Sequence, residues 1–167
     1  IPEVLRSSHL KIELMSRGRG QAMLLEDQST QILFDAGDTA SRDGGFTRIR
    51  DRLWRKGIQQ LDALFLSHPH LDHQGAVPEL IRQGFVRKVF ITDSYESHSA
   101  GHWIVETGKR NKVPIQTIKS GQIWQIGSFM IRIVGIGIPQ HYSPSANDLS
   151  PIILIQWRNQ SVVTTGD

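Results

Sequence analysis

The chain has 167 residues, of which 38% are hydrophobic, and this length suits one domain with a substantial buried core. It contains no cysteine, which excludes disulfides, thiolate metal ligands and cysteine nucleophiles. The formal net charge of +3 is compatible with an anionic substrate, and no apolar run approaches the roughly 20 residues that a membrane-spanning helix needs.

The first third of the chain predicts three short strands and a helix. Apolar runs separated by turn-like links indicate strands at 10–15, 21–26 and 31–37. Residues 44–57 place Phe46, Ile49 and Leu53 at helical spacing, and Gly57 is suited to a C-terminal cap.

Residues 61–91 read as a strand, a polar motif, a helix and a second strand, which favours a right-handed parallel crossover. The helix is expected over 75–84, with Pro78 in or near its first turn. A further helix is predicted at 96–111. The remaining predicted strands are 114–118, 122–127, 129–138, 151–157 and 161–167. Strands therefore dominate over about three helices, and we expect residues 1–167 to form one domain.

The polar motif SHPHLDHQG, residues 67–75, follows the predicted strand at 61–66. Strand residues two apart point the same way, so an extended chain lets His68 and His70 reach one ion together. Asp72 and His73 come where the chain turns toward a helix, which suits them to a second ion nearby. Imidazole and carboxylate are common ligands of zinc and similar ions. The alternative is a solvated polar loop, but the crowding of four such groups favours metal binding.

The stretch LDALFLSHPHLDHQGAVPEL resembles the His-x-His-x-Asp-His signature of the metallo-β-lactamase superfamily. Its form is similar to that of the extracytoplasmic domain of ComEC-type DNA-internalisation competence proteins. Three further stretches resemble that family in the same order along the chain. They are GRGQAMLLEDQSTQILFDAGD, NDLSPIILIQW and SVVTTGD.

The resemblance implies an αββα sandwich of two facing mixed sheets covered by helices, with two divalent metal ions at one sheet edge. These ligands accept zinc, manganese or iron. The implied ligands are His68 and His70 for the first ion, Asp72 and His73 for the second, and Asp167 as the bridge. His141 is the candidate third ligand of the first ion by its position, with a solvated loop histidine as the alternative. Asp35 corresponds to the aspartate that supports the ligand loops.

The sequence departs from the family pattern at two places. Where family members carry Asp-Val-Gly-Gln-Gly-Asp, this chain reads SRGRGQ, so Ser16 and Gln21 replace acids and Arg17 and Arg19 add positive charge. The chain also ends at Asp167, before the His-His-Gly-Ser segment that supplies the last ligand of the second metal. We therefore expect the final segment of the fold to be missing.

Two metals imply hydrolysis by a metal-activated water, with Asp72 orienting it or accepting its proton. The competence-type resemblance implies a nuclease that acts on single-stranded DNA during uptake. Such a domain would lie on the extracytoplasmic face of the bacterial inner membrane, and its parent protein would span the membrane outside this segment. The candidate DNA contacts are Arg17, Arg19, Arg48, Arg52 and Arg55. Two alternatives stay open: a soluble hydrolase of a lactone, thioester or small phosphodiester, whose compartment is open, and a degenerate domain that guides DNA without cutting it.

Overall fold

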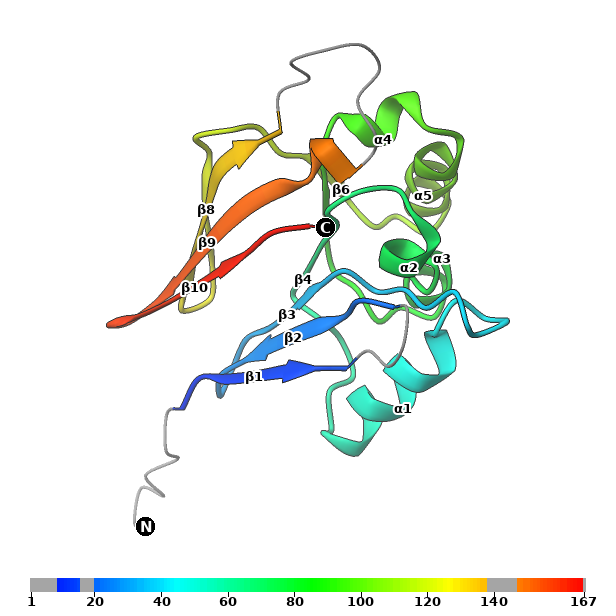
Figure 1. Ribbon diagram of the computed structural model, residues 1–167. Helices are drawn as coiled ribbons and strands as arrows, with labels where there is room; N and C mark the ends of the chain where they lie inside the picture. The colour runs from blue at the N-terminus through cyan, green and yellow to red at the C-terminus, as the bar shows by residue number, and fades with distance from the viewer. Residues whose placement is uncertain (1–8, 16–19, 138–146, 167) are drawn as a thin grey trace.

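The computed structural model describes residues 9–15, 20–137 and 147–166, and it contains two sheets that face each other (Figure 1). The larger sheet has six strands in the order β1-β2-β3-β4-β5-β6. Its strands are β1 (Lys11–Leu14), β2 (Met23–Glu26), β3 (Gln31–Phe34), β4 (Ala63–Phe65), β5 (Val89–Ile91) and β6 (Ile115–Thr117). The first two pairings are antiparallel and the pairings from β3 to β6 are parallel.

Helices connect the parallel strands of this sheet, as parallel neighbours require. The helix between β3 and β4 is α1 (Phe46–Arg55). Between β4 and β5 lie α2 (Leu71–Gln74) and α3 (Val77–Arg82), and between β5 and β6 lie α4 (Ser94–Ser97) and α5 (Ser99–Arg110). The predicted parallel crossover over residues 61–91 is therefore confirmed.

The second sheet was expected to be mixed, but its described pairings are all antiparallel, with the order β10-β9-β8-β7. Its strands are β7 (Ile123–Ile126), β8 (Phe129–Ile136), β9 (Pro151–Trp157) and β10 (Gln160–Thr164), and the short 3₁₀ helix Asn147–Leu149 precedes β9. Along β8, Phe129, Ile131 and Ile133 are buried while Arg132 and Val134 are exposed. This alternation gives the sheet one face toward the core and one toward solvent.

Two hydrophobic cores lie on the two faces of the six-stranded sheet. Leu33, Leu64 and Val89 face the helices, whereas the neighbouring Phe65 and Phe90 face the four-stranded sheet. The Phe65 and Phe90 rings stack with centroids 4.3 Å apart. On the helical side, α1 buries Phe46, Ile49 and Leu53, the three residues whose spacing predicted it.

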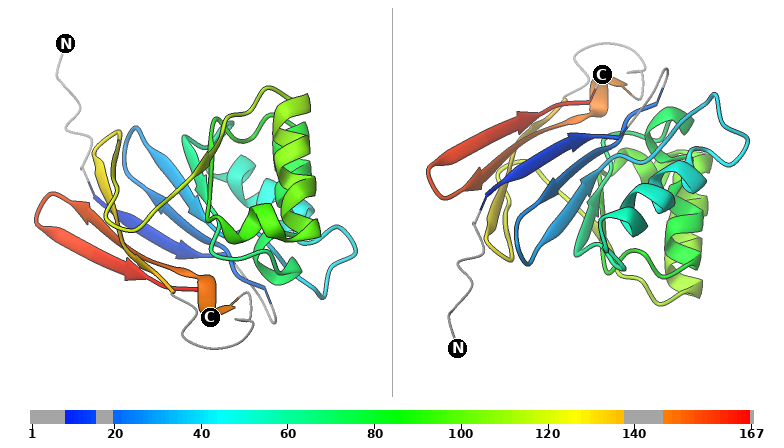
Figure 2. Two further views of the ribbon diagram at one scale, coloured as in Figure 1. Left: turned by 90° about the horizontal axis from the view of Figure 1, so that it is seen from above. Right: turned by 90° about the horizontal axis from the view of Figure 1, so that it is seen from below.

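The two facing sheets and the helical layer over the larger sheet agree with the expected sandwich (Figure 2). Within the described residues, the outer face of the four-stranded sheet carries no helix. The expectation of about three helices missed α2 and α4, whose four residues each are too few to show a helical period. No helix of the described residues is long and apolar enough to cross a membrane.

Candidate metal centre

The histidine motif lies where β4 ends and α2 begins. His70 keeps an extended backbone at φ −92° and ψ 149°, and the helix starts at the next residue. The expected turn into a helix after His70 is observed, but the chain bends at Pro69, so the extended run expected from His68 to His70 is interrupted. The His68 ring lies 4.6 Å from the His70 ring and 3.9 Å from the His73 ring, measured between centroids. His68 and His73 are fully buried, and His70 is exposed.

Asp35 joins the motif to the neighbouring strand β3. Its backbone has a positive φ of 56°, unusual for a residue other than glycine, and this turn aims the carboxylate at the motif. One oxygen accepts the Ser67 amide at 2.8 Å. The other accepts the Ser67 hydroxyl at 2.8 Å and lies 2.9 Å from Nδ1 of His73. A carboxylate only accepts, so Nδ1 of His73 is the donor and carries the proton.

His68 is held through its ring and through its backbone. Its Nδ1 lies 3.0 Å from the Ser67 hydroxyl and 3.3 Å from the Ser150 hydroxyl. The buried Tyr95 hydroxyl donates to the His68 carbonyl at 2.6 Å. Burial, with the nearby charge of Asp35 in second place, raises the pKa of Tyr95 well above its ordinary value, so this hydroxyl stays protonated as a donor.

Sequence reasoning assigned no role to Tyr95 or Ser67. Ser150 ends the Asn-Asp-x-Ser stretch on which the resemblance partly rests, and its contact with His68 gives that stretch a function at the site. Tyr95 lies in α4 and offered no comparable signal in the sequence.

The strand-end loops fasten α2 in place through their backbones. The Ala36 amide donates to the His73 carbonyl at 2.6 Å, and the Gln21 amide donates to the Asp72 carbonyl at 2.9 Å. Gly37 packs so closely that a Cβ atom there would lie 2.3 Å from the carbonyl carbon of Asp72. The position of Asp72 and His73 is therefore set by loops distant in the sequence.

The donor chemistry of the motif fits a divalent ion. Because Nδ1 of His73 and Nδ1 of His68 are both engaged by protein groups, Nε2 is the ring atom left for coordination, and both Nε2 atoms are buried. The Asp72 side chain is 34% exposed, and its Oδ2 lies 3.9 Å from Nε2 of His73. Across residues 9–15, 20–137 and 147–166, however, no three such side chains are already gathered around one point.

Two of the expected ligands, His141 and Asp167, lie outside the described residues. The chain nevertheless reaches the motif at Gly166, where an added Cβ would lie 2.0 Å from the Ser150 hydroxyl and 3.3 Å from Cβ of Ser67. The expected roles of His141 and Asp167 remain predictions.

The candidate DNA contacts separate into three groups. Arg17 and Arg19 lie outside the described residues. On α1, Arg48 pairs with Asp38 at 2.5 Å and Arg52 pairs with Glu13, so both already neutralise a carboxylate of the protein. Arg55 is exposed and forms no ion pair with any described residue. Among the ion pairs of the described residues, Arg48, Arg50 and Arg52 of α1 each have a carboxylate partner and Arg55 has none.

Comparisons with known proteins give a matching family model and two similar curated proteins. The family model described as the metallo-beta-lactamase superfamily matches residues 15–164. ComE operon protein 3 of Bacillus subtilis (strain 168) is 25% identical over 96% of this chain and 22% of its own length. Transcription termination factor FttA of Methanosarcina mazei is 35% identical over 41% of this chain and 11% of its own length. The chain thus spans less than a quarter of either curated relative.

Solved structures share the fold. The metallo-beta-lactamase fold protein YhfI from Bacillus subtilis superimposes with a TM-score of 0.63 at 15% identity, covering 95% of this chain and 63% of that protein. A metallo-beta-lactamase with a HARLDQ motif from Cronobacter sakazakii gives 0.61 at 18% identity, covering 91% of this chain and 57% of that protein.

Proposed function

The chain belongs to the metallo-β-lactamase superfamily, and from this premise we propose that it is a metal-dependent hydrolase that cleaves phosphodiester bonds of single-stranded DNA. Members of this superfamily generally bind divalent metals, typically zinc. The observation that carries the proposal is the hydrogen bond from Nδ1 of His73 to Asp35, beside the buried ring of His68. A histidine that binds a metal through one ring nitrogen usually donates a hydrogen bond from the other to a carboxylate or carbonyl, and this bond orients the ring.

The proposed ligands are His68 and His70 for one ion and Asp72 and His73 for a second, with Asp167 between them and His141 completing the first. When bound, the ions would act as Lewis acids and lower the pKa of water. The protein's own contribution is to hold the ligands. Asp35 keeps the proton of His73 on Nδ1, and Tyr95 fixes the backbone at His68. The Ser67 hydroxyl links Asp35 to Nδ1 of His68.

Asp72 is suited to proton transfer because its carboxylate is both near the histidines and accessible. Its side chain is 34% exposed, while that of His73 is 1% exposed. A general base must lie within hydrogen-bond reach of the proton that it removes, and a water can approach this carboxylate from solvent. We therefore assign Asp72 a second role, in accepting a proton from the attacking water.

The substrate class is supported by the relatives and by charge. ComE operon protein 3 matches 96% of the chain, and the second relative is named as a transcription termination factor. The formal net charge of +3 favours a polyanion. On the competence-type resemblance, we place the domain on the extracytoplasmic face of the bacterial inner membrane, as part of a protein that takes up DNA.

A cleavage assay tests this proposal. The wild type is loaded with zinc or manganese and incubated with an end-labelled single-stranded oligonucleotide, and products are separated by length. We expect shortened strands with the wild type and none with His68→Ala. Intact strands with every metal would contradict the proposal. Hydrolysis of a lactone or thioester in the same samples would then assign the site to another substrate class, and DNA binding without cleavage would indicate a guiding domain.

A further inference from the structure

A cavity of about 580 Å³ opens beside α2, within the size range of small-molecule sites. Its walls are the loop between β3 and α1, the first turn of α1, the α2–α3 turn and α5. Leu71, the residue between His70 and Asp72, lines it. The cavity and the metal centre therefore share one backbone turn.

The loop that forms one wall is tightly fixed. A Cβ added to Gly44 would lie 2.4 Å from the backbone of Gly75, so the loop packs directly on the end of α2. Within the loop, Asp43 accepts hydrogen bonds from the Ser41 hydroxyl and from the Gly45 and Thr47 amides. The Ser41 hydroxyl first, and Thr47 next, hold the pKa of Asp43 well below its ordinary value. The cavity is thus preformed.

Arg42 differs from the other charged side chains that line the cavity in having no partner among the described residues. Asp38 pairs with Arg48 at 2.5 Å, Asp43 is satisfied within its loop, and Glu79 pairs with Arg82 at 2.9 Å. Arg42 also lines the cavity, is exposed, and has no ion pair or hydrogen bond to the part of the chain that the structure describes. Arg42 therefore offers a cation to a phosphate, while Asp43 of the same loop keeps its negative charge, because the groups that donate to it are neutral.

Two large apolar side chains in the cavity wall are exposed to solvent. Trp103 of α5 is 50% exposed and Leu71 is 61% exposed, although both are large apolar side chains. The Arg82 guanidinium lies over the Trp103 ring, 5.5 Å from its centroid. Indole and guanidinium are both flat surfaces on which a nucleobase stacks.

We infer that this cavity binds one nucleotide unit of a single-stranded DNA, with its base against Trp103 and its phosphate on Arg42. The inference rests on the proposed function and extends it, because a strand held there would lie next to the turn that carries His70 and Asp72. Stacking tolerates any base and an arginine reads only the phosphate, so this site would add affinity without sequence preference.

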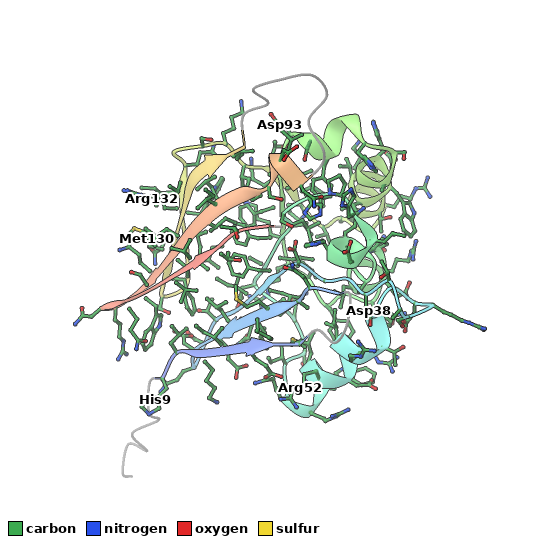
Figure 3. The ribbon with its side chains drawn as sticks, in the orientation of Figure 1. His9, Asp38, Arg52, Asp93, Met130 and Arg132 are labelled. Atoms are coloured by element: carbon green, nitrogen blue, oxygen red, sulfur yellow. The ribbon has the colours of Figure 1, made fainter. Side chains whose placement is uncertain are left out.

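The test measures binding of a fluorescein-labelled oligothymidylate by anisotropy, in the presence of a chelator so that the strand stays intact. Arg42→Ala and Trp103→Ala should each raise the dissociation constant about tenfold, while Trp103→Phe keeps most of the affinity because it keeps an aromatic face. The matched controls are Arg132→Ala and Trp54→Ala, which should leave it unchanged. Trp54 is 57% exposed beneath Arg50, and Arg132 lies on the four-stranded sheet, across the molecule from Asp38 at the cavity (Figure 3).

Failure of this inference differs from failure of the proposed function. If the wild type does not bind the strand, or if Arg42→Ala and Trp103→Ala bind it as the wild type does, the cavity is not a nucleotide site. If the metal-loaded wild type then still cleaves DNA, the proposed function stands without the cavity. Absence of cleavage by the loaded wild type would instead overturn the proposed function, whatever the binding data show.

Discussion

Nδ1 of His73 donates a hydrogen bond to Oδ2 of Asp35 at 2.9 Å, across 38 residues of sequence. The same carboxylate accepts two hydrogen bonds from Ser67, the residue that precedes His68. One buried aspartate at the end of β3 therefore orients groups at both ends of the histidine motif. Because it keeps the proton of His73 on Nδ1, it leaves Nε2 as the atom that would coordinate the proposed metal.

Replacing Asp35 by asparagine should weaken metal binding while preserving side-chain volume. The asparagine side chain lacks the negative charge that attracts the Nδ1–H group of His73. Its NH₂ group is also a donor, where the carboxylate had an accepting oxygen. Loss of such a supporting partner typically lowers metal affinity by about 10–100-fold. Competition with a chromogenic chelator measures this directly.

The matched control for this substitution is Asp62→Asn. Asp62 lies at the opposite end of the strand pair, just before β4, where its carboxylate accepts the Gln31 amide at 2.9 Å. It should leave metal affinity unchanged. Equal metal affinity in Asp35→Asn and the wild type would show that Asp35 supports the fold alone.

Gly37→Ala should destabilise the protein by about 1–3 kcal/mol, the usual cost of overpacking. The added methyl would meet the carbonyl carbon of Asp72 at 2.3 Å and the carbonyl oxygen of Leu71 at 2.4 Å, and neither backbone atom can rotate away. Urea denaturation measures the free energy of unfolding. Gly135→Ala is the control, because a Cβ there meets nothing within 4 Å. Equal stability of Gly37→Ala and Gly135→Ala would refute the close packing of this loop on α2.

The contribution of Asp43 to stability should disappear in acid. The Ser41 hydroxyl and Thr47 hold its pKa below the ordinary value of 3.8 in the folded protein. A depressed folded pKa stabilises the protein above the unfolded value, and that stability is lost as the pH falls toward the folded value. The difference in unfolding free energy between wild type and Asp43→Ala should therefore be constant above about pH 5 and shrink below about pH 4. A difference that grows on acidification would contradict this sign.

Arg55 should contribute more than Arg52 to the salt dependence of the affinity for single-stranded DNA. Each phosphate contact contributes about −0.7 to the slope of log affinity against log salt. Arg52 already pairs with Glu13, whereas Arg55 has no ion pair among the described residues. We expect Arg55→Ala to reduce the magnitude of the slope by about 0.7 and Arg52→Ala to leave it nearly unchanged. DNA titrations at several salt concentrations measure the slope for each variant. Equal slopes for Arg55→Ala and Arg52→Ala would contradict the prediction that Arg55 contacts a phosphate and Arg52 does not.

The sequence predicts those helices and strands whose pattern of apolar residues is complete within the element itself. The spacing of Phe46, Ile49 and Leu53 predicted α1, and the helix between two apolar runs predicted the parallel pair β4 and β5. The helix α2 was not predicted because its four residues complete barely one turn. The amides of Ala36 and Gln21, from other loops, donate to the carbonyls of its residues His73 and Asp72.

The candidate site divides in the same way. Histidine spacing and family resemblance singled out His68, His70, Asp72 and His73, because the motif is contiguous. The residues that hold them are not contiguous with it. Tyr95 meets the His68 carbonyl from 27 residues away and Ser150 meets the His68 ring from 82 residues away, so only the folded chain reveals these contacts.

We propose that this chain hydrolyses phosphodiester bonds with metal held by the histidine motif. This claim is tested most directly by measuring bound metal and the initial rate of single-stranded DNA cleavage on the same samples, as metal is added stepwise to the metal-free protein. We predict that the rate rises with bound metal in the wild type, and that His68→Ala shows neither metal nor cleavage. Cleavage that is independent of bound metal, or a wild type that binds metal and leaves DNA intact, would contradict the claim.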